Sequence, residues 1–177
     1  MFERGGTDVY KAKFVSEEQG STMNLSFSAT SNFDQFSRKY EIVYKNIFDN
    51  YLYYQRISNT VIGKTSVILG GIKTTILSNY DVGKHKITID KTKLYLDDVF
   101  VKDLTIGDTL NTGSQQTIRL RNNSFYEMKI YQDDVLVYHF VPAYRLVGNN
   151  KEDYGIAELV NEEFVFNSNL TGKPEYE

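Results

Sequence analysis

Alternation of apolar and polar residues, interrupted at short intervals by turn-forming sequences, is the feature that most limits the fold of this chain. Tyr10, Ala12 and Phe14 alternate with lysines, and Leu25 and Phe27 alternate with asparagine and serine. A period of two places the apolar side chains on one face of a strand. The pattern returns at residues 85–90, 94–96, 128–130 and 135–137, with turn signals at 17–21, 58–60, 70–71, 81–83, 97–98, 107–108, 122–123 and 133–134. Many short strands between frequent turns predict an all-β sandwich of two antiparallel sheets.

One segment fits two periods. Helical spacing of three or four residues relates Phe33, Phe36, Tyr40, Val43 and Ile47. Ile42 and Tyr44 with their neighbours fit a strand equally well. We predict a short helical turn near residues 31–37, followed by a strand over residues 38–45.

The size and composition of the chain fit one domain that needs no disulfide or metal to fold. The 177 residues include 14 Tyr and 11 Phe but no Trp and only 2 Pro, and aromatic residues favour pleated sheets. We expect a single domain over 1–177, with 1–7 and 168–177 as flexible or docking termini. The chain has no cysteine, so it offers no thiol nucleophile, zinc–thiolate site or disulfide.

Charge and hydropathy exclude two partner classes. A net charge of −3 and a pI of about 5.5 do not fit the basic face that grips a phosphate backbone, so we expect no nucleic-acid partner. No run of 18 apolar residues occurs and Met1 is followed by no signal-like segment, so we expect no membrane partner. A chain without cysteine or a signal-like segment is compatible with synthesis in the cytoplasm.

The second half of the chain carries longer motifs. Residues 93–101 read K-L-Y-L-D-D-V-F-V, residues 129–142 read K-I-Y-Q-D-D-V-L-V-Y-H-F-V-P, and residues 154–167 read Y-G-I-A-E-L-V-N-E-E-F-V-F-N. This order resembles the concanavalin A-like, laminin-G-like sandwich domains of structural proteins in tailed bacteriophages. In that family a K-I-Y-x-x-G-x-L-V-x-x-F-I-P run precedes an x-G-L-Y-D-x-V-N-x-x-F-Y-x-N run.

The resemblance spans residues 83–167 and implies a concanavalin A-like jelly roll and a place in a virion. Two departures change the expectations. Asp98 and Asp134 stand where the family has glycine, and aspartate accepts a positive φ less readily, so we expect turns of another type. Residues 170–177 do not match the closing motif of the family, which leaves the last strand without support.

The sequence offers little to a glycosidase. Enzymes of this fold deliver two carboxylates from one Glu-x-Asp-x-x-Glu strand, and no such run occurs. Asp97-Asp98 and Glu162-Glu163 are adjacent pairs, which a strand directs to opposite faces, so we interpret them as solvated turn residues.

The other catalytic and metal-binding candidates are weak as well. His85 and His139 are the only imidazoles, each lies within a strand pattern, and no metal-ligand spacing accompanies them, so we interpret both as packed or edge residues. Five aspartates do not follow the spacing of a calcium loop and are interpreted as turn residues: Asp81, Asp97, Asp98, Asp103 and Asp108. We expect no catalytic residue, no metal and no cofactor.

The densest aromatic cluster is the candidate binding site. It consists of Tyr51, Tyr53, Tyr54 and Arg56. Tyr and Arg are enriched at protein interfaces, and flat aromatic faces also stack on sugars. Three interpretations remain open: Tyr51 and Tyr53 in the core with Tyr54 facing water, a protein interface, or a glycan platform.

Three functions are compatible with these features: a capsid decoration or auxiliary protein, a receptor- or carbohydrate-binding module of a head fibre or tail protein, and a glycan-processing enzyme. No segment is interpreted as a linker, an internal repeat, a coiled coil or a collagen-like shaft. We therefore expect first a non-enzymatic virion structural protein that binds the capsid surface. Its expected partners are other virion proteins, with host-surface glycan as the alternative.

Overall fold

The structure is a computed structural model. Its backbone is described for residues 2–4, 7–15, 22–28, 38–46, 54–57, 60–63, 66–69, 72–76, 83–107, 115–121, 123–147, 151–166 and 173–176. Side chains are described for residues 38–44, 67–69, 72–76, 83–107, 126–143 and 156–162.

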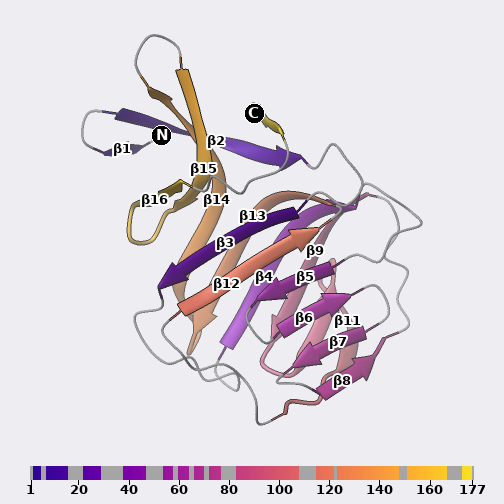
Figure 1. The fold of residues 1–177 in the computed structure, drawn as a ribbon. Helices are drawn as coiled ribbons and strands as arrows, with labels where there is room; N and C mark the ends of the chain where they lie inside the picture. Colours follow the sequence, from indigo (N-terminus) through magenta and orange to yellow (C-terminus); the bar gives the residue numbers. More distant parts are fainter. Residues whose placement is uncertain are drawn as a thin grey trace.

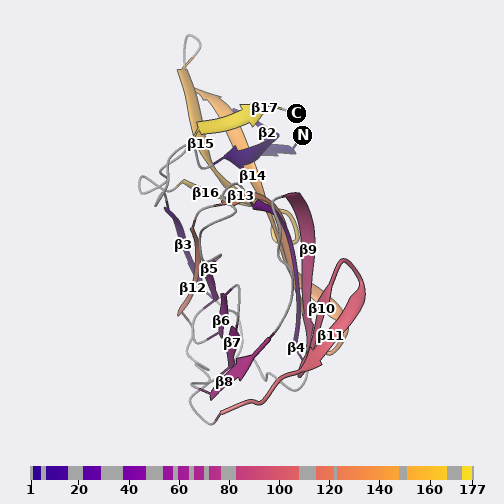
Figure 2. The same cartoon turned by 90° about the vertical axis from the view of Figure 1, so that its right-hand side faces the viewer.

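The described elements are all strands, and they form two sheets that face each other as two layers (Figure 2). Every strand pairing is antiparallel. The expected all-β class and its two antiparallel sheets are therefore confirmed.

The larger sheet has 11 strands. Its main path is β11 (Val99–Asp103), β10 (Lys93–Leu96), β9 (Gly83–Asp90), β4 (Arg38–Asn46), β13 (Asn123–Gln132), β2 (Thr7–Val15), β14 (Val135–Val147), β15 (Lys151–Glu158) and β16 (Glu163–Phe166). β1 (Phe2–Arg4) and β17 (Lys173–Tyr176) pair with β2. β13 and β14 also pair directly near their shared turn, and β2 lies between them farther from it, where the strands diverge (Figure 1).

The smaller sheet has 6 strands, and it lies across the inner face of β4, β9 and β13 (Figure 1). Its order is β3 (Thr22–Ser28), β12 (Gln115–Arg121), β5 (Tyr54–Ile57), β6 (Thr60–Gly63), β7 (Ser66–Leu69) and β8 (Ile72–Thr75). Residues 104–107 connect the margins of the two sheets: the Thr105 amide donates to Thr74 Oγ1 at 3.1 Å, and the Gly107 amide donates to the Leu69 carbonyl at 3.0 Å.

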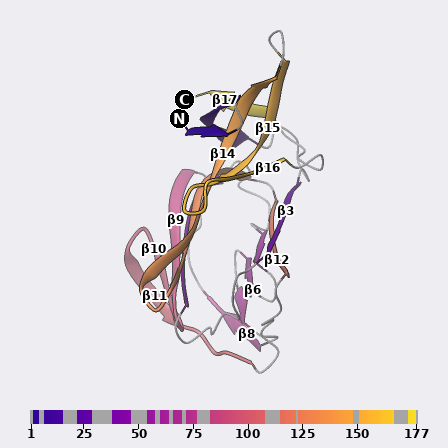
Figure 3. The ribbon, with the colours of Figure 1, turned by 90° about the vertical axis from the view of Figure 1, so that its left-hand side faces the viewer.

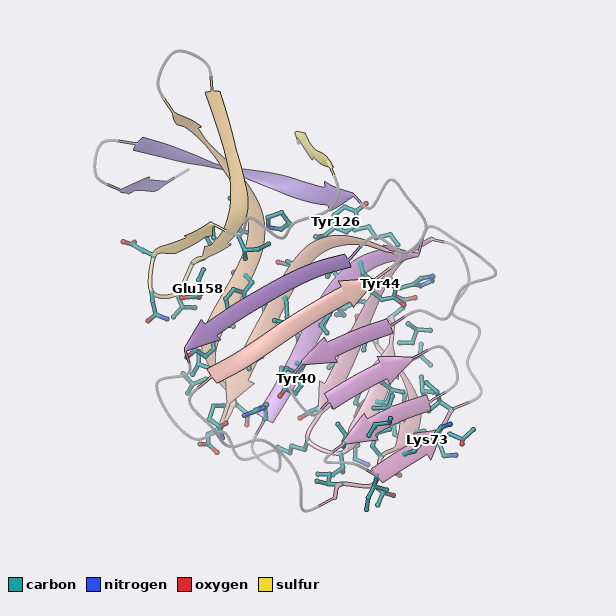
Figure 4. The ribbon with its side chains drawn as sticks, in the orientation of Figure 1. Tyr40, Tyr44, Lys73, Tyr126 and Glu158 are labelled. Atoms are coloured by element: carbon teal, nitrogen blue, oxygen red, sulfur yellow. The ribbon has the colours of Figure 1, made fainter. Side chains whose placement is uncertain are left out.

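The core lies between the sheets because alternate residues of each strand turn inward. Tyr40 and Tyr44 are among its largest side chains and lie behind the smaller sheet in Figure 4. The smaller sheet contributes Val67 and Leu69. The apolar residues of the period-two segments at 85–90, 94–96 and 128–130 belong to this core, since they are buried or, for Leu96, packed against the buried cluster: Ile87, Ile89, Leu94, Leu96, Met128 and Ile130.

Both Asp-Asp turns correct a prediction. Asp97 and Asp98 have φ angles of 50° and 65°, and Asp133 and Asp134 have φ angles of 50° and 62°. Positive φ at both central residues is the geometry of a type I′ two-residue hairpin turn. Aspartate therefore takes the positive φ that we expected it to accept less readily, because it is one of the few residues that enter the left-handed region without glycine.

The two hairpins form an internal repeat, which the sequence analysis missed. Residues 93–101 and 129–137 share six of nine residues, K-x-Y-x-D-D-V-x-V. Each hairpin also shifts register at the same place, after Leu94 and after Ile130. Leu94 lies opposite Ile89, Ile130 lies opposite Tyr40, and these two partners lie opposite each other. An approximate two-fold axis between β4 and β9 therefore relates the hairpins.

The register shift also corrects the facing of β14. The sequence placed Val135, Val137 and His139 on one face, but the extra residue interrupts the alternation. Val137 packs against the core, whereas Val135 is 63% exposed.

The remaining predictions about the fold concern residues 31–45 and the C-terminal segment. The strand expected over 38–45 is β4, which is confirmed. The helical turn expected near 31–37 lies outside the described residues. The C-terminal segment without family support contains β17, which pairs with β2.

Candidate binding surface

The aromatic cluster is described only in part. Tyr54 and Arg56 lie in β5, an interior strand of the smaller sheet, opposite Arg121 and Arg119 of β12. Tyr51 and Tyr53 lie outside the described residues. The structure therefore brings Tyr54 and Arg56 onto one strand and leaves the interface prediction for the cluster open.

Two of the exposed large apolar side chains are neighbours on β11, where the strand directs them to opposite faces. Val99 is 67% exposed and Phe100 is 49% exposed, and both begin the strand that ends the larger sheet. An open hollow of about 490 Å³ runs along the edge, lined by Phe100, Val101, Lys102 and Asp103. The β10–β11 hairpin stands at the outer margin of the molecule (Figure 3). We call Val99–Asp103 and this hollow the β11 edge.

Contacts within the hairpin hold the exposed aromatic ring in place. Tyr95 meets Phe100 edge-on with ring centroids 5.7 Å apart, and the Lys93 ammonium lies 5.4 Å from the Phe100 centroid. Lys93 also pairs with Asp103 at 2.9 Å. A held aromatic ring loses little conformational entropy on binding, which favours a role as an anchor.

The charges beside this ring are already engaged. Lys102 Nζ donates to the Thr75 carbonyl of the other sheet at 3.0 Å, and the Asp103 carboxylate is occupied by Lys93. Asp103 is thus paired with an opposite charge, whereas Lys102 bonds a neutral carbonyl and keeps its positive charge beside the apolar residues.

The turn at the tip of this hairpin is fixed by its acidic residues. The Asp97 carboxylate accepts from the His85 ring and from the Lys86 amide, each at 2.8 Å, and Asp98 pairs with the Lys86 ammonium at 2.6 Å. Burial raises the pKa of Asp97, but its hydrogen bonds to His85 and Lys86 and their charges outweigh burial, so its pKa lies below the ordinary value of 3.8. The Asp98 hydrogen bond raises the pKa of Lys86.

We expect the Asp97 contacts to stabilise the fold in a pH-dependent way. A carboxyl whose pKa falls on folding stabilises the folded state above its unfolded pKa, and this contribution is lost as the pH falls through the folded pKa. The wild type should therefore be more stable than Asp97→Asn above about pH 4 and lose that advantage below it. Urea unfolding across this range measures the difference. Asp133→Asn, at the same turn position of the other hairpin, is the control, and equal pH dependence in both variants would contradict the assignment.

The outer face of the larger sheet carries two small polar clusters. In one, Lys39 pairs with Glu41 at 3.4 Å and lies 4.1 Å from the ring centroid of Tyr131, whose hydroxyl donates to Glu41 at 3.2 Å. Burial, followed by the charge of Glu41, raises the pKa of Tyr131, so its hydroxyl remains protonated near neutral pH.

The second cluster contains one of the two histidines. His139 Nε2 lies 2.9 Å from Glu127 Oε2, and Lys129 lies 3.7 Å from the same carboxylate group. His139 and His85 therefore lie within strands, as predicted, but each has a carboxylate partner that the sequence analysis missed. These partners are set by which residues lie opposite each other on neighbouring strands, and the sequence alone does not give that register.

Glu158 is a buried carboxylate with a structural role. It lies at the turn between β15 and β16 (Figure 4) and is 3% exposed. Its oxygens accept from the backbone amides of Val160 and Asn161 at 2.9 and 2.8 Å and from the Asn161 side-chain amide at 2.7 Å. The His139 amide donates to it at 2.9 Å. Its acceptor sites are directed at this turn, so Glu158 shapes the fold.

The acidic candidates named from the sequence are distributed among these contacts. Asp97, Asp98 and Asp103 pair with basic side chains, and Glu162 is exposed in the turn after Glu158. Among the residues whose side chains are described, no three His, Cys, Asp or Glu side chains gather as metal ligands. Asp81 and Asp108 lie outside the described residues.

The fold and surface define a two-sheet β-sandwich with an exposed apolar edge strand. Neither protein-family models nor curated proteins yield a match to this chain. None of the described residues forms a helix that could span a membrane.

Proposed function

We propose that this protein is a non-enzymatic structural protein of a tailed-bacteriophage virion, with a concanavalin A-like jelly-roll fold. In this proposal it is a capsid decoration or auxiliary protein that docks on the particle surface. The observation that carries the proposal is the β11 edge, where Val99 and Phe100 remain exposed beside an open hollow while the flanking charges are engaged within the chain.

The motif order supports the virion assignment. Each of the three segments that resemble the phage domains falls on a pair of consecutive strands: β10 with β11, β13 with β14, and β15 with β16. Asp98 and Asp134 take a positive φ at the turn positions where the phage domains have glycine. Both hairpins therefore keep a two-residue turn.

The chemistry of the described side chains supports a binding role over catalysis. Glu158 is occupied by backbone donors, Glu41 and Glu127 are paired with cations, and Asp97 and Asp98 hold a turn. A catalytic acid or base must be free to contact a substrate, and these carboxylates are already bonded within the chain.

A receptor- or carbohydrate-binding module of a head fibre or tail protein is the second candidate. The outer face favours it, because Tyr131 and Glu41 form a hydrogen-bonded aromatic and acidic pair, and such pairs contact sugar hydroxyls and ring faces. Tyr54 and Arg56 of β5 fit a binding role under either candidate function.

Copurification with intact virions tests the proposal. We expect the protein to remain on density-purified particles in hundreds of copies, as a decoration protein would, and to release no reducing sugar from host polysaccharide. A handful of copies per particle would favour the fibre or tail module. Absence from washed virions, or sugar release that a single carboxylate substitution abolishes, would contradict the proposal.

A further inference from the structure

We infer that the β11 edge binds the β11 edge of a second copy of this chain, in antiparallel register about a two-fold axis at Phe100. The pair joins the larger sheets of the two copies. The pairing can be tested on the isolated protein, whereas its role on the particle rests on the proposed function. The inference begins from the position of β11, which pairs with β10 alone among the described strands and ends the larger sheet.

The register of the hairpin identifies the backbone groups available for pairing. Leu96 lies opposite Val99 across the two-residue turn, and the pair that closes such a hairpin exchanges both hydrogen bonds. The next pair, Tyr95 opposite Phe100, is then the non-hydrogen-bonded kind, and its ring centroids lie 5.7 Å apart. The Phe100 N–H and C=O therefore face the open edge. Across a two-fold axis, the Phe100 residues of two copies can exchange both hydrogen bonds.

The exposed apolar side chains of β11 find apolar neighbours in this register. With Phe100 at the two-fold axis, the two Phe100 rings lie opposite each other, and Val99 of each copy lies opposite Val101 of the other. Phe100 and Val99 are 49% and 67% exposed in the single chain. A shift of two residues in either direction keeps the outward backbone groups paired, but it sets the Phe100 ring against Asp98 or Lys102. The apolar match therefore selects the register centred on Phe100.

The free charge of the edge also fits a second copy. Lys102 bonds the neutral Thr75 carbonyl at 3.0 Å and keeps its positive charge. In the register centred on Phe100 it comes opposite Asp98 of the other copy, whose side chain is 75% exposed. The two-fold axis repeats this contact on both sides, and opposite charges that face each other stabilise a ladder.

The same register also opposes Asp97 to Asp103. Each of these carboxylates already binds a basic side chain of its own copy, since Asp97 accepts from His85 at 2.8 Å and Asp103 pairs with Lys93 at 2.9 Å. Asp97 also lies in the turn, outside the strand itself. The repulsion between them is therefore weaker than between two unpaired carboxylates.

The bulge of β11 keeps the new ladder short. Val101 is the extra residue between Phe100 and Lys102, and such a residue bends and twists an edge strand. Since small interfaces belong to weak complexes, we expect a weak dimer in dilute solution. Two copies side by side on one particle have an effective concentration of roughly millimolar, which populates the pair and helps to retain each copy.

Sedimentation equilibrium and hydrogen exchange over a concentration series test this inference. Up to about 1 mM, the mass should rise toward that of two chains, and the Phe100 amide should exchange at least about fivefold more slowly than in dilute solution. The Val99 amide, already bonded to Leu96, should change little and serves as the internal control. A constant single-chain mass, or unchanged exchange at Phe100, would overturn the inference. If that single-chain protein still bound virions, the edge would belong to a capsid protein and the proposed function would stand.

Matched substitutions in the two Asp-Asp turns test the register. Asp98→Asn removes the charge opposite Lys102 and keeps a residue that accepts a positive φ, and Asp134→Asn makes the same change in the other hairpin. We expect Asp98→Asn to weaken self-association about two- to tenfold, because an exposed ion pair is lost on each side of the axis, and Asp134→Asn to leave it unchanged. Equal dissociation constants for the two variants would contradict the register centred on Phe100.

Discussion

Ile130→Ala should lower the free energy of unfolding by about 2–5 kcal/mol. Ile130 is 2% exposed and packs in the core between the two sheets, so truncation removes buried methyl groups and leaves a cavity. For a chain of this size the loss corresponds to a fall in Tm of about 2–4 °C for each kcal/mol. Urea unfolding monitored by circular dichroism measures it.

The same hairpin supplies the control for this experiment. Val135, five residues along the same hairpin, is 63% exposed, so Val135→Ala should change stability by less than about 0.5 kcal/mol. If Ile130→Ala cost less than about 1 kcal/mol, the inner face of β13 would have been assigned incorrectly.

Glu158→Ala should be nearly as damaging, at about 3–5 kcal/mol, because it removes the acceptor for three backbone amides at a buried site. Each buried donor left without a partner costs about 1–3 kcal/mol, and the turn cannot expose all of them without moving. Thermal and urea unfolding give the magnitude. Glu162→Ala, in the same turn but exposed, should stay within about 0.5 kcal/mol. Similar losses in the two variants would mean that Glu158 does not hold this turn.

Period-two patterning was enough to predict the sheet class and the inward faces of β9, β10 and β13, because burial of one strand face leaves a direct trace in residue type. It failed where one residue changes the alternation. The extra residue in β14 reversed the facing of Val137 relative to Val135, and no local sequence signal distinguishes that shift.

The repeat was available in the sequence but was not recognised. Residues 93–101 and 129–137 differ at positions such as Leu96 and Gln132. The shared K-x-Y-x-D-D-V-x-V pattern therefore becomes evident only when the two hairpins are aligned. The partners of His85 and His139 were not predictable in this way, because they depend on which strands lie side by side, as with His139 and Glu127. Glu158 accepts mainly from its own turn, and only the His139 amide comes from a neighbouring strand.

The β11 edge could not be predicted from composition either. Val99 and Val135 occupy the same position in two segments that share six of nine residues. Of their two strands, however, only β11 ends the sheet along its whole length, whereas β15 covers β14 from Phe140 onward. The order of the strands, rather than the residues themselves, makes one hairpin a candidate for docking.

The most direct test of the docking account compares these two valines on particles. Val99→Ser and Val135→Ser make the same chemical change after the same Asp-Asp turn, at 67% and 63% exposure, so their effects on stability should match. Affinity for virions depleted of the protein should fall about tenfold for Val99→Ser, as expected for loss of roughly 1.4 kcal/mol at an apolar anchor, and less than about twofold for Val135→Ser. Equal affinities of the two variants, or a larger loss for Val135→Ser, would contradict the account.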